Sequence, residues 1–190
     1  MTHNGAIGFQ VENAMSSIAA AWGLGLKWDD IRVGLQTFSN DIHSSAGRFN
    51  LFNYRGATVI ADYGHNPDAI TALVHAVEAI PSKRRVVVIS GTGDRRDIDN
   101  RQQTEILGDA FDVVLLYQGK YQCGREDGAV MAVLREGLAN AKRTTVVEEI
   151  RGHILAIDTA LSYLNEGDLC LILIETVDEA LEHIAQCVLS

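Results

Sequence analysis

Short apolar runs that alternate with helix-like stretches are the feature that most constrains the fold of this 190-residue chain. The runs VVVIS, at 86–90, and LCLILI, at 169–174, are apolar at almost every position. A strand without a polar face has to be covered on both sides, as it is in a parallel sheet between two layers of helices. Because helix-like stretches follow the strands, we expect right-handed crossovers and a doubly wound sheet.

The pattern predicts an α/β fold: a mostly parallel, Rossmann-like sheet of about six strands with helices on both faces. The predicted strands are Phe49–Tyr54, Thr58–Ala61, Arg85–Ser90, Val113–Tyr117, Thr144–Val147 and Leu169–Ile174. The predicted helices of this region are Pro67–Ile80, Asn100–Ala110, Asp127–Asn140, Ile150–Leu164 and Val177–Val188. Arg55 and Gly56 form a short turn between the first two strands, which leaves room for an antiparallel pair there. Glu148 and Glu149 are interpreted as the solvated start of a helix.

Two further helices are predicted before the sheet, at residues 12–25 and at Trp28–Phe38. Asp29 and Asp30 lie in the first turn of the second helix, where the helix dipole favours carboxylates. The polar stretch SNDIHSSAG, at 39–47, is interpreted as a linker. Apolar side chains on these helices need a cover, so we expect the helices to fold back onto the α/β body or to pair with another copy.

The composition is that of an ordinary globular protein, and it disfavours several functional classes. Hydrophobic residues make up 47% of the chain and charged residues 22%, which is sufficient for a packed core. The net charge of −9 argues against a general nucleic-acid binder, which would present a basic face. No signal peptide is visible and the longest apolar run is too short to span a bilayer, so a cytoplasmic protein without a membrane partner is expected.

Cysteines and helical histidines point to no metal site. Cys123, Cys170 and Cys187 are odd in number, widely spaced and without a C-x-x-C pair, so neither a zinc site nor a disulfide framework is predicted. Cys170, within an apolar run, is interpreted as a buried apolar residue. His75 and His183 fall inside predicted helices and are interpreted as structural or surface residues.

Two of the predicted strands end in unusually polar segments. DYGHNP, at 62–67, follows ATVIA, and GTGDRRD, at 91–97, follows VVVIS. Ligands of open α/β sheets bind beyond the carboxyl ends of the strands, and both segments would lie at that edge. Gly91 and Gly93 permit a close approach of the backbone to a ligand, and the start of the following helix could attract an anion.

These polar residues also have ordinary structural explanations. An aspartate before a helix is often a cap, although Asp62 is too far from Pro67 for an ideal one. Two polar strand ends at one edge favour a ligand site, where Asp62 could accept hydrogen bonds from a ribose and His65 could bind a ligand or pass a proton. GTGDRR lacks the third glycine of G-x-G-x-x-G, which disfavours a nucleotide-dependent oxidoreductase. The 190 residues contain no G-x-x-x-x-G-K-[ST] motif.

Three ordered motifs resemble the C-terminal domain of the Mur ligase family. They are G-R-F at 47–49, D-Y-G-H-N-P-D-A at 62–69 and the glycine-rich loop at 91–97. The segment NAMSSIAAAWGLGL, at 13–26, is similar to the last helices of the family's central ATPase domain, so the resemblance extends from about Gly8 to the C-terminus.

The resemblance implies a division of the chain into two parts. Residues 1–45 would be remnant helices of the central ATPase domain plus a linker, and residues 46–190 the C-terminal α/β domain. The family's P-loop, magnesium ligands and carbamylated lysine belong to the central domain. We therefore expect a C-terminal piece of a ligase, inactive by itself, that needs the ATPase half or a partner subunit.

Mur ligases are ATP-dependent amide-forming enzymes, so the resemblance implies ATP and Mg²⁺ as cofactors and an amino-acid or peptide substrate. The stretch at 47–70 is most similar to the cyanophycin synthetases, a branch that adds arginine to the aspartate side-chain carboxyl of a polymer through an acyl phosphate. The UDP-muramoyl amino-acid ligases and folylpolyglutamate synthases share much of the same pattern. A non-catalytic binding or interaction module derived from a Mur ligase is the alternative, and a homo-oligomer formed through the N-terminal helices is a further expectation.

The resemblance also implies roles for nucleotide-binding residues. Asn13 matches the asparagine that contacts adenine, and Arg48 matches the arginine that approaches the nucleotide. Asp62 matches the aspartate near the ribose, and Asn66 matches a position that lines the cleft.

Two residues are implied to act in catalysis. His65 matches another position that lines the cleft, and Arg95 matches the loop arginine that faces the acceptor or the incoming amino acid. The loop reads G-T-G-D-R where many family members have G-x-G-G-D-R, so it is one glycine shorter.

Overall fold

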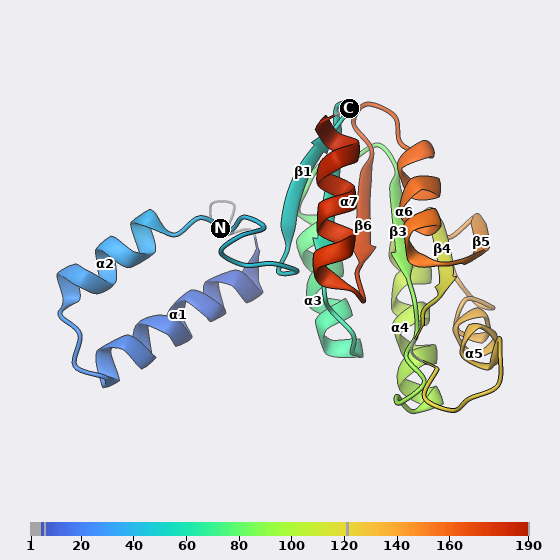
Figure 1. Ribbon diagram of the computed structural model, residues 1–190, viewed down its shortest axis with the longest axis horizontal. Coiled ribbons are helices and arrows are strands. Elements are labelled where there is room, and N and C mark those ends of the chain that lie inside the picture. Colours follow the sequence, from blue (N-terminus) through green and yellow to red (C-terminus); the bar gives the residue numbers. More distant parts are fainter. Residues whose placement is uncertain (1–4, 6, 121, 190) are drawn as a thin grey trace.

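The computed structural model describes Gly5, residues 7–120 and residues 122–189. In this part of the chain it contains seven helices and six strands (Figure 1). The helices are α1 (Gly8–Gly23), α2 (Trp28–Thr37), α3 (Pro67–Glu78), α4 (Asp97–Ala110), α5 (Ala129–Gly137), α6 (His153–Ser162) and α7 (Val177–Leu189). The strands are β1 (Asn50–Tyr54), β2 (Ala57–Asp62), β3 (Arg85–Ile89), β4 (Val113–Gln118), β5 (Val146–Arg151) and β6 (Leu169–Leu173). None of the described helices is both long enough and apolar enough to cross a bilayer.

The strands form a single sheet in the order β1-β2-β6-β3-β4-β5. β1 is antiparallel to β2, and every other neighbouring pair is parallel. Arg55 and Gly56 connect the antiparallel pair with φ angles of 50° and 82°. Positive φ at both central residues is the geometry of the two-residue hairpins whose twist matches that of the strands. The predicted turn therefore produces the single antiparallel pair of the sheet.

Helices cover both faces of the sheet, as the apolar runs predicted. Adjacent residues of β3 point to opposite faces: Val87 packs in the core beneath α3, α4 and α5, and Val88 packs in the core beneath α6 and α7. Leu171 and Ile172 divide in the same way on β6. All four side chains are almost completely buried, and burial of such a side chain stabilises the fold by about 1.5–3 kcal/mol. The expected mostly parallel, doubly wound sheet is confirmed.

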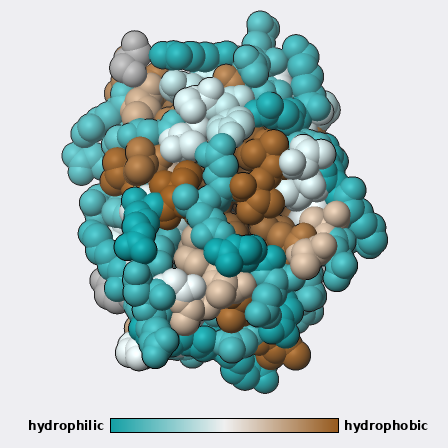
Figure 2. Space-filling model, turned by 90° about the vertical axis from the view of Figure 1, so that its right-hand side faces the viewer, coloured by the Kyte–Doolittle hydropathy of each residue, from teal (hydrophilic) through white to brown (hydrophobic). Residues whose placement is uncertain are grey.

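The predicted fifth strand ended too early, and the predicted helix after it began too early. β5 continues to Arg151 because it pairs with β4 along its whole length. Glu148 and Glu149 are therefore residues of an edge strand, and their interpretation as the start of a helix was wrong. Gly152, with a φ of 96°, separates β5 from α6 in a conformation that favours glycine. Figure 2 shows the molecule from the right-hand side of Figure 1, the side of α5 and β5, where hydrophilic side chains surround several hydrophobic ones.

α1 and α2 project away from the α/β body (Figure 1). The first turn of α1 touches the body, where the rings of Phe9 and Phe49 meet edge to face at 5.7 Å between centroids. Farther along, Trp22 on α1 is 71% exposed and Trp28 on α2 is 62% exposed. The expected return of these helices onto the body is therefore wrong beyond the first turn of α1, and pairing with another copy stays a prediction.

Candidate functional site

A pocket of about 550 Å³ lies between the start of α1 and the carboxyl edge of the sheet. Its lining includes all six residues that the sequence singled out: Asn13, Arg48, Asp62, His65, Asn66 and Arg95. They come from α1, the G-R-F turn, the end of β2 with the segment after it, and the loop after β3. β2 and β3 both run parallel to β6, which lies between them, so their carboxyl ends share one edge. The topology gathers the predicted residues, and their roles in binding stay predictions.

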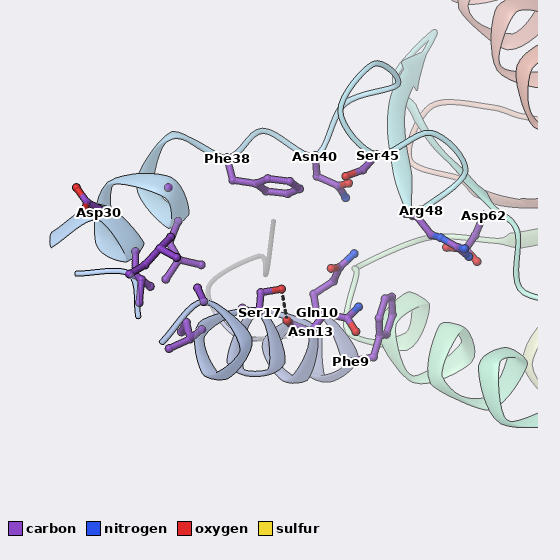
Figure 3. A pocket seen from close by; sticks show the side chains of 17 residues that line it. Phe9, Gln10, Asn13, Ser17, Asp30, Phe38, Asn40, Ser45, Arg48 and Asp62 are labelled. Carbon is purple, nitrogen blue, oxygen red and sulfur yellow. Dashed lines mark hydrogen bonds between the residues drawn. The ribbon is translucent and has the colours of Figure 1, made fainter. Parts of the chain in front are cut away.

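A second pocket, of about 490 Å³, continues from the first between α1, α2 and the linker. Phe9, Asn13, Arg48 and Asp62 line both pockets. Figure 3 shows Arg48 and Asp62 close together at one end, with α1 on one side and the ring of Phe38 on the other. The remaining lining of this second pocket is largely apolar, so a planar, weakly polar group would fit between the helices.

Asp62 is buried at the end of β2, with 7% of its surface exposed. Its Oδ2 accepts a hydrogen bond of 2.8 Å from the backbone N–H of Phe49. Burial raises the pKa of Asp62 to about 6, although N–H groups of Phe49 and Gly64 and the positive charge of Arg48 act in the opposite direction. A carboxylate with a pKa of about 6 changes its charge close to physiological pH. Shifted pKa values of this kind are common at binding and catalytic sites.

The turn that carries Arg48 is built from two residues in left-handed conformations. Gly47 has a φ of 69° and Phe49 a φ of 53°, which is uncommon for a residue with a side chain. The N–H of Gly47 donates to the Asn50 side chain at 2.7 Å, and its carbonyl accepts from the N–H of Tyr63 at 2.9 Å. The first bond lies within the turn and the second joins the turn to the segment after β2, and the Arg48 guanidinium lies 5.9 Å from the centre of the Tyr63 ring.

His65 is oriented by its neighbour in the same segment. Its Nδ1 lies 2.7 Å from the carbonyl oxygen of Tyr63. Because a carbonyl only accepts, Nδ1 carries the proton and Nε2 is the nitrogen left for a ligand. Burial lowers the pKa of His65, and the charge of Arg95 lowers it further, while the Tyr63 carbonyl and Asp94 act to raise it. The imidazole is therefore neutral at physiological pH and presents an acceptor.

Asn66 has a structural function besides its place in the pocket. Its Oδ1 accepts a hydrogen bond of 2.8 Å from the N–H of Ala69, so it caps α3. Pro67 occupies the first turn of the same helix, where its missing N–H costs nothing. The cap that Asp62 is too distant to provide is therefore supplied by Asn66.

The loop that carries Arg95 is held in place by Arg125, which the sequence analysis missed. Arg125 donates to the carbonyl oxygens of Gly93 at 2.8 Å and of Arg95 at 2.6 Å, and it forms an ion pair with Asp97. A Cβ atom on Gly93 would lie 1.9 Å from the carbonyl oxygen of Gln122, so this position requires glycine. No local pattern marks Arg125, because its partners lie about 30 residues earlier in the chain.

Glu175 was also missed, although its setting resembles that of Asp62. It directly follows the apolar run of β6, and burial raises the pKa of its carboxyl group. Its Oε1 is buried and has no hydrogen-bond partner among the residues that the structure describes. A Cβ on Gly119 would lie 2.0 Å from the other oxygen, so that glycine makes room for the carboxylate. The signal in the sequence was a single acidic residue after an apolar strand. Such a residue is weak evidence for a site when the residues around it in space are not known.

The donor groups of the first pocket suit a nucleotide better than a metal ion. Arg48 and Arg95 supply two cations that can face phosphate oxygens. Glu12 and Asp62 are the carboxylates among the described lining residues, and one Asp62 oxygen already accepts from Phe49. Mg²⁺ in such sites takes carboxylate, water and phosphate oxygens, so these residues do not form a magnesium cage and we assign no Mg²⁺ ligand to them.

Curated relatives match almost the whole chain. Cyanophycin synthetase of Trichormus variabilis is 30% identical over 182 residues, which is 96% of this chain and 20% of the relative. UDP-N-acetylmuramoyl-L-alanyl-D-glutamate–2,6-diaminopimelate ligase of Bradyrhizobium diazoefficiens is 31% identical over 166 residues, which is 86% of this chain and 32% of the relative. The chain thus spans about a fifth of the length of the first relative and about a third of the second.

Solved structures share the fold, and a family profile matches its sheet. E. coli FolC in complex with ADP superimposes with a TM-score of 0.71 at 24% identity, over 92% of this chain and 39% of FolC. Residues 47–173, more than half of the chain, match the family described as "Mur ligase, glutamate ligase domain". The matched range contains the G-R-F, DYGHNP and GTGDRR segments that form the pocket. This chain belongs to the Mur ligase C-terminal domain family.

Proposed function

We propose that this chain is the C-terminal part of an ATP-dependent amide-forming ligase and that its two connected pockets bind the nucleotide. The observation that carries the proposal is the convergence of four separate segments on one pocket with two cations, two carboxylates and a neutral imidazole. A division at the linker, into residues 1–45 and 46–190, accompanies the proposal. FolC, which has the same fold, is seen in complex with ADP, and this supports a nucleotide as the ligand class.

Different lining residues are assigned to different parts of the nucleotide. The guanidinium groups of Arg48 and Arg95 face the phosphates, whose charge they offset through charge-assisted hydrogen bonds. Asp62 accepts hydrogen bonds from the ribose with the oxygen that Phe49 does not use. Asn13 contacts the adenine edge, and the apolar groove that contains Phe38 receives the ring.

In the complete ligase, ATP would transfer its γ-phosphoryl group to a carboxylate with release of ADP, and an amine would then displace inorganic phosphate from the acyl phosphate to form the amide. Arg95 is placed to offset charge that develops on the reacting groups, because catalysis of phosphoryl transfer depends on positioning and on cations. His65 lines the pocket and, with Nδ1 held by the Tyr63 carbonyl, can accept a proton from the attacking amine at Nε2. Mg²⁺ would be held by residues outside the described lining, in the ATPase half or partner subunit that completes the site.

We propose arginine as the amine substrate and an aspartate side-chain carboxyl as its acceptor. The similarity to cyanophycin synthetase over 96% of this chain supports this choice. The match to a diaminopimelate ligase, over 86% of the chain, keeps the UDP-muramoyl ligases as the competing assignment within the family, together with the folylpolyglutamate synthases. Cytoplasmic location follows from a substrate such as ATP and belongs to the proposal.

A non-catalytic interaction module is the second candidate function. The exposed apolar side chains of α1 and α2, such as Trp22 and Trp28, favour a surface that another protein covers. In this case the pocket would be a remnant, and substitutions in it would leave the function of the protein unchanged.

Nucleotide titration of the 190-residue chain tests the pocket assignment. We expect weak binding of ATP, without hydrolysis, and a loss of affinity of at least about tenfold for Arg95→Ala. Arg96→Ala is the matched control, because the neighbouring arginine is 79% exposed and pairs with Asp99 on α4. Equal affinities of the two variants, or no ATP binding at all, would contradict the assignment and favour the interaction module.

A chimera tests the substrate. The segment of the Trichormus variabilis enzyme that matches this chain is replaced by the chain, and arginine-dependent ATP turnover on an aspartate polymer is measured. We expect turnover with arginine that falls at least about tenfold on Asp62→Ala. The assignment of arginine as the substrate is wrong if this chimera binds ATP without turnover while a chimera built in the diaminopimelate ligase is active. The assignment of the chain to a ligase would then stand.

A further inference from the structure

Helices α6 and α7 cover the face of the sheet opposite to that covered by α3, α4 and α5. They bring three potential metal ligands together. His183 and Cys187 lie one turn apart on α7, four residues from each other, so their side chains share one face of the helix. Asp158 reaches them from α6, which packs beside α7 over the same core. We propose that Asp158, His183 and Cys187 form a zinc-binding site.

The separations between the donor atoms support a tetrahedral ion. Sγ of Cys187 lies 3.6 Å from Nε2 of His183 and 4.0 Å from Oδ1 of Asp158, and the imidazole nitrogen lies 2.6 Å from that oxygen. Ordinary zinc–ligand bond lengths in a tetrahedron separate sulfur from nitrogen and from oxygen by about 3.6 Å, and nitrogen from oxygen by about 3.4 Å. The sulfur–nitrogen distance already matches, whereas the sulfur–oxygen distance is about 0.4 Å too long and the nitrogen–oxygen distance about 0.8 Å too short, so the carboxylate oxygen would have to move by about 1 Å to complete the tetrahedron.

The kinds of donor select the metal. A thiolate, an imidazole and a carboxylate are together the ligand types of zinc, whereas Mg²⁺ and Ca²⁺ take oxygen ligands alone. Asp158 and His183 have 49% and 24% of their side-chain surface exposed, so an ion can reach the cluster and a water molecule can complete the tetrahedron. Three protein ligands and one open position make a site that binds zinc on a preformed pair of helices.

The simpler interpretation is a hydrogen bond from Nε2 of His183 to the Asp158 carboxylate with Cys187 packed nearby. A neutral imidazole can make this bond, and the interpretation assigns no function to sulfur. The two interpretations differ in one measurable respect, because only the zinc site makes the response to metal depend on Cys187. The sequence analysis missed this cluster because it has a single cysteine and its third donor, Asp158, lies 25 residues before His183 on another helix.

Cobalt titration of the intact 190-residue chain tests the proposal. Co²⁺ takes zinc sites, and a cysteine ligand produces an intense thiolate-to-metal charge-transfer band. We expect this band to saturate at one equivalent of Co²⁺ and to disappear when Zn²⁺ is added. Zn²⁺ should also raise the thermal midpoint, because a ligand that binds the folded state alone stabilises it. Absence of the charge-transfer band in the unsubstituted chain would overturn the proposal.

Substitutions locate the ion. Cys187→Ser should abolish the band and lower Zn²⁺ affinity at least about tenfold, and Asp158→Asn should lower the affinity in the same direction. Cys123→Ser removes an exposed cysteine elsewhere, and His75→Gln removes an exposed helical histidine on α3, so both controls should retain the full response. A response that survives Cys187→Ser, or that is lost equally in the Cys123→Ser control, would overturn the site. Circular dichroism without metal verifies that each variant is folded.

Discussion

The side chain of Asp62 and the backbone N–H of Phe49 form a hydrogen bond of 2.8 Å across thirteen residues of the chain. This bond joins the end of β2 to the G-R-F turn, so the positions of Asp62 and Arg48 depend on each other. Phe49, with a left-handed φ of 53°, directs its N–H toward the carboxylate. Asp62 is therefore at once a structural acceptor and a ligand candidate, and the two functions can be separated by experiment.

Asp62→Asn is expected to stabilise the folded chain at pH 7.5. The pKa of Asp62 rises from 3.8 to about 6 on folding, so the folded state binds the proton more tightly than the unfolded state. The free energy of unfolding therefore falls as the pH rises from about 4 to about 6 and stays lower above that window. Asparagine keeps the acceptor for Phe49 and removes the charge, a gain of up to about 3 kcal/mol at about 1.4 kcal/mol per pKa unit.

Urea denaturation between pH 4 and 8 measures this effect of Asp62→Asn. The pH dependence between about 4 and 6 should be weaker in the variant, and nucleotide binding should be weaker as well. Asp168→Asn is the matched control, because Asp168 is a buried aspartate directly before β6, at the amino end of that strand. Reduced stability of Asp62→Asn at pH 7.5, with the slope unchanged, would show that the burial of its charge is not the dominant effect.

Arg125→Met is expected to loosen the loop that carries Arg95. The substitution keeps much of the apolar stem and removes the donors to the carbonyl oxygens of Gly93 and Arg95. We expect a loss of about 1–3 kcal/mol in the free energy of unfolding, together with a loss of ATP affinity similar to that of Arg95→Ala. Arg151→Met, at an ion pair whose arginine is 82% exposed, should change stability by less than about 0.5 kcal/mol. A change in Arg125→Met as small as that control would refute a supporting role.

Gly93→Ala is expected to destabilise the chain because the new side chain would collide with the backbone of a neighbouring loop. The added Cβ would lie 1.9 Å from the carbonyl oxygen of Gln122, and a backbone atom cannot move aside as a flexible side chain can. We expect a cost of about 1–3 kcal/mol by thermal or urea unfolding. Gly34→Ala in α2, with no atom within 4 Å of the new Cβ, should cost nothing and should increase helix stability by about 0.5–1 kcal/mol. Similar behaviour of the two variants would contradict the close approach of the two loops.

The isolated chain is expected to self-associate through α1 and α2. Trp22 is 71% exposed on a face that also carries other large apolar side chains, and burial of one such side chain contributes about 2 kcal/mol. Sedimentation velocity over a range of concentrations should show association that Trp22→Ser weakens at least about tenfold. Leu155→Ser on α6, at a side chain that is 57% exposed on the body, should have no effect. A monomer at every concentration would exclude pairing through these helices.

Local patterns in the sequence predicted the buried strands and most helices and, together with the family resemblance, six of the residues that line the pocket. Apolar runs such as those of β3 and β6 predict a covered sheet because a strand without a polar face is stable only between two layers. The DYGHNP segment identified Asp62 because polar residues at the end of a buried strand need a reason to be there, and Arg48 was identified by the resemblance of the G-R-F segment to the Mur ligase family. The edge strand β5 was misjudged because alternate side chains of an edge strand face solvent and weaken the apolar signal.

Contacts between distant segments decided everything else. The position of β6 between β2 and β3, the support of the Arg95 loop by Arg125, the outward direction of α1 and α2, and the cluster of Asp158 with two residues of α7 all join residues that are far apart in the sequence. Periodicity records which face of an element is buried, and it carries no information about which other element buries it. That choice depends on the summed packing and hydrogen bonding of the whole fold, and it exists only once the chain has collapsed.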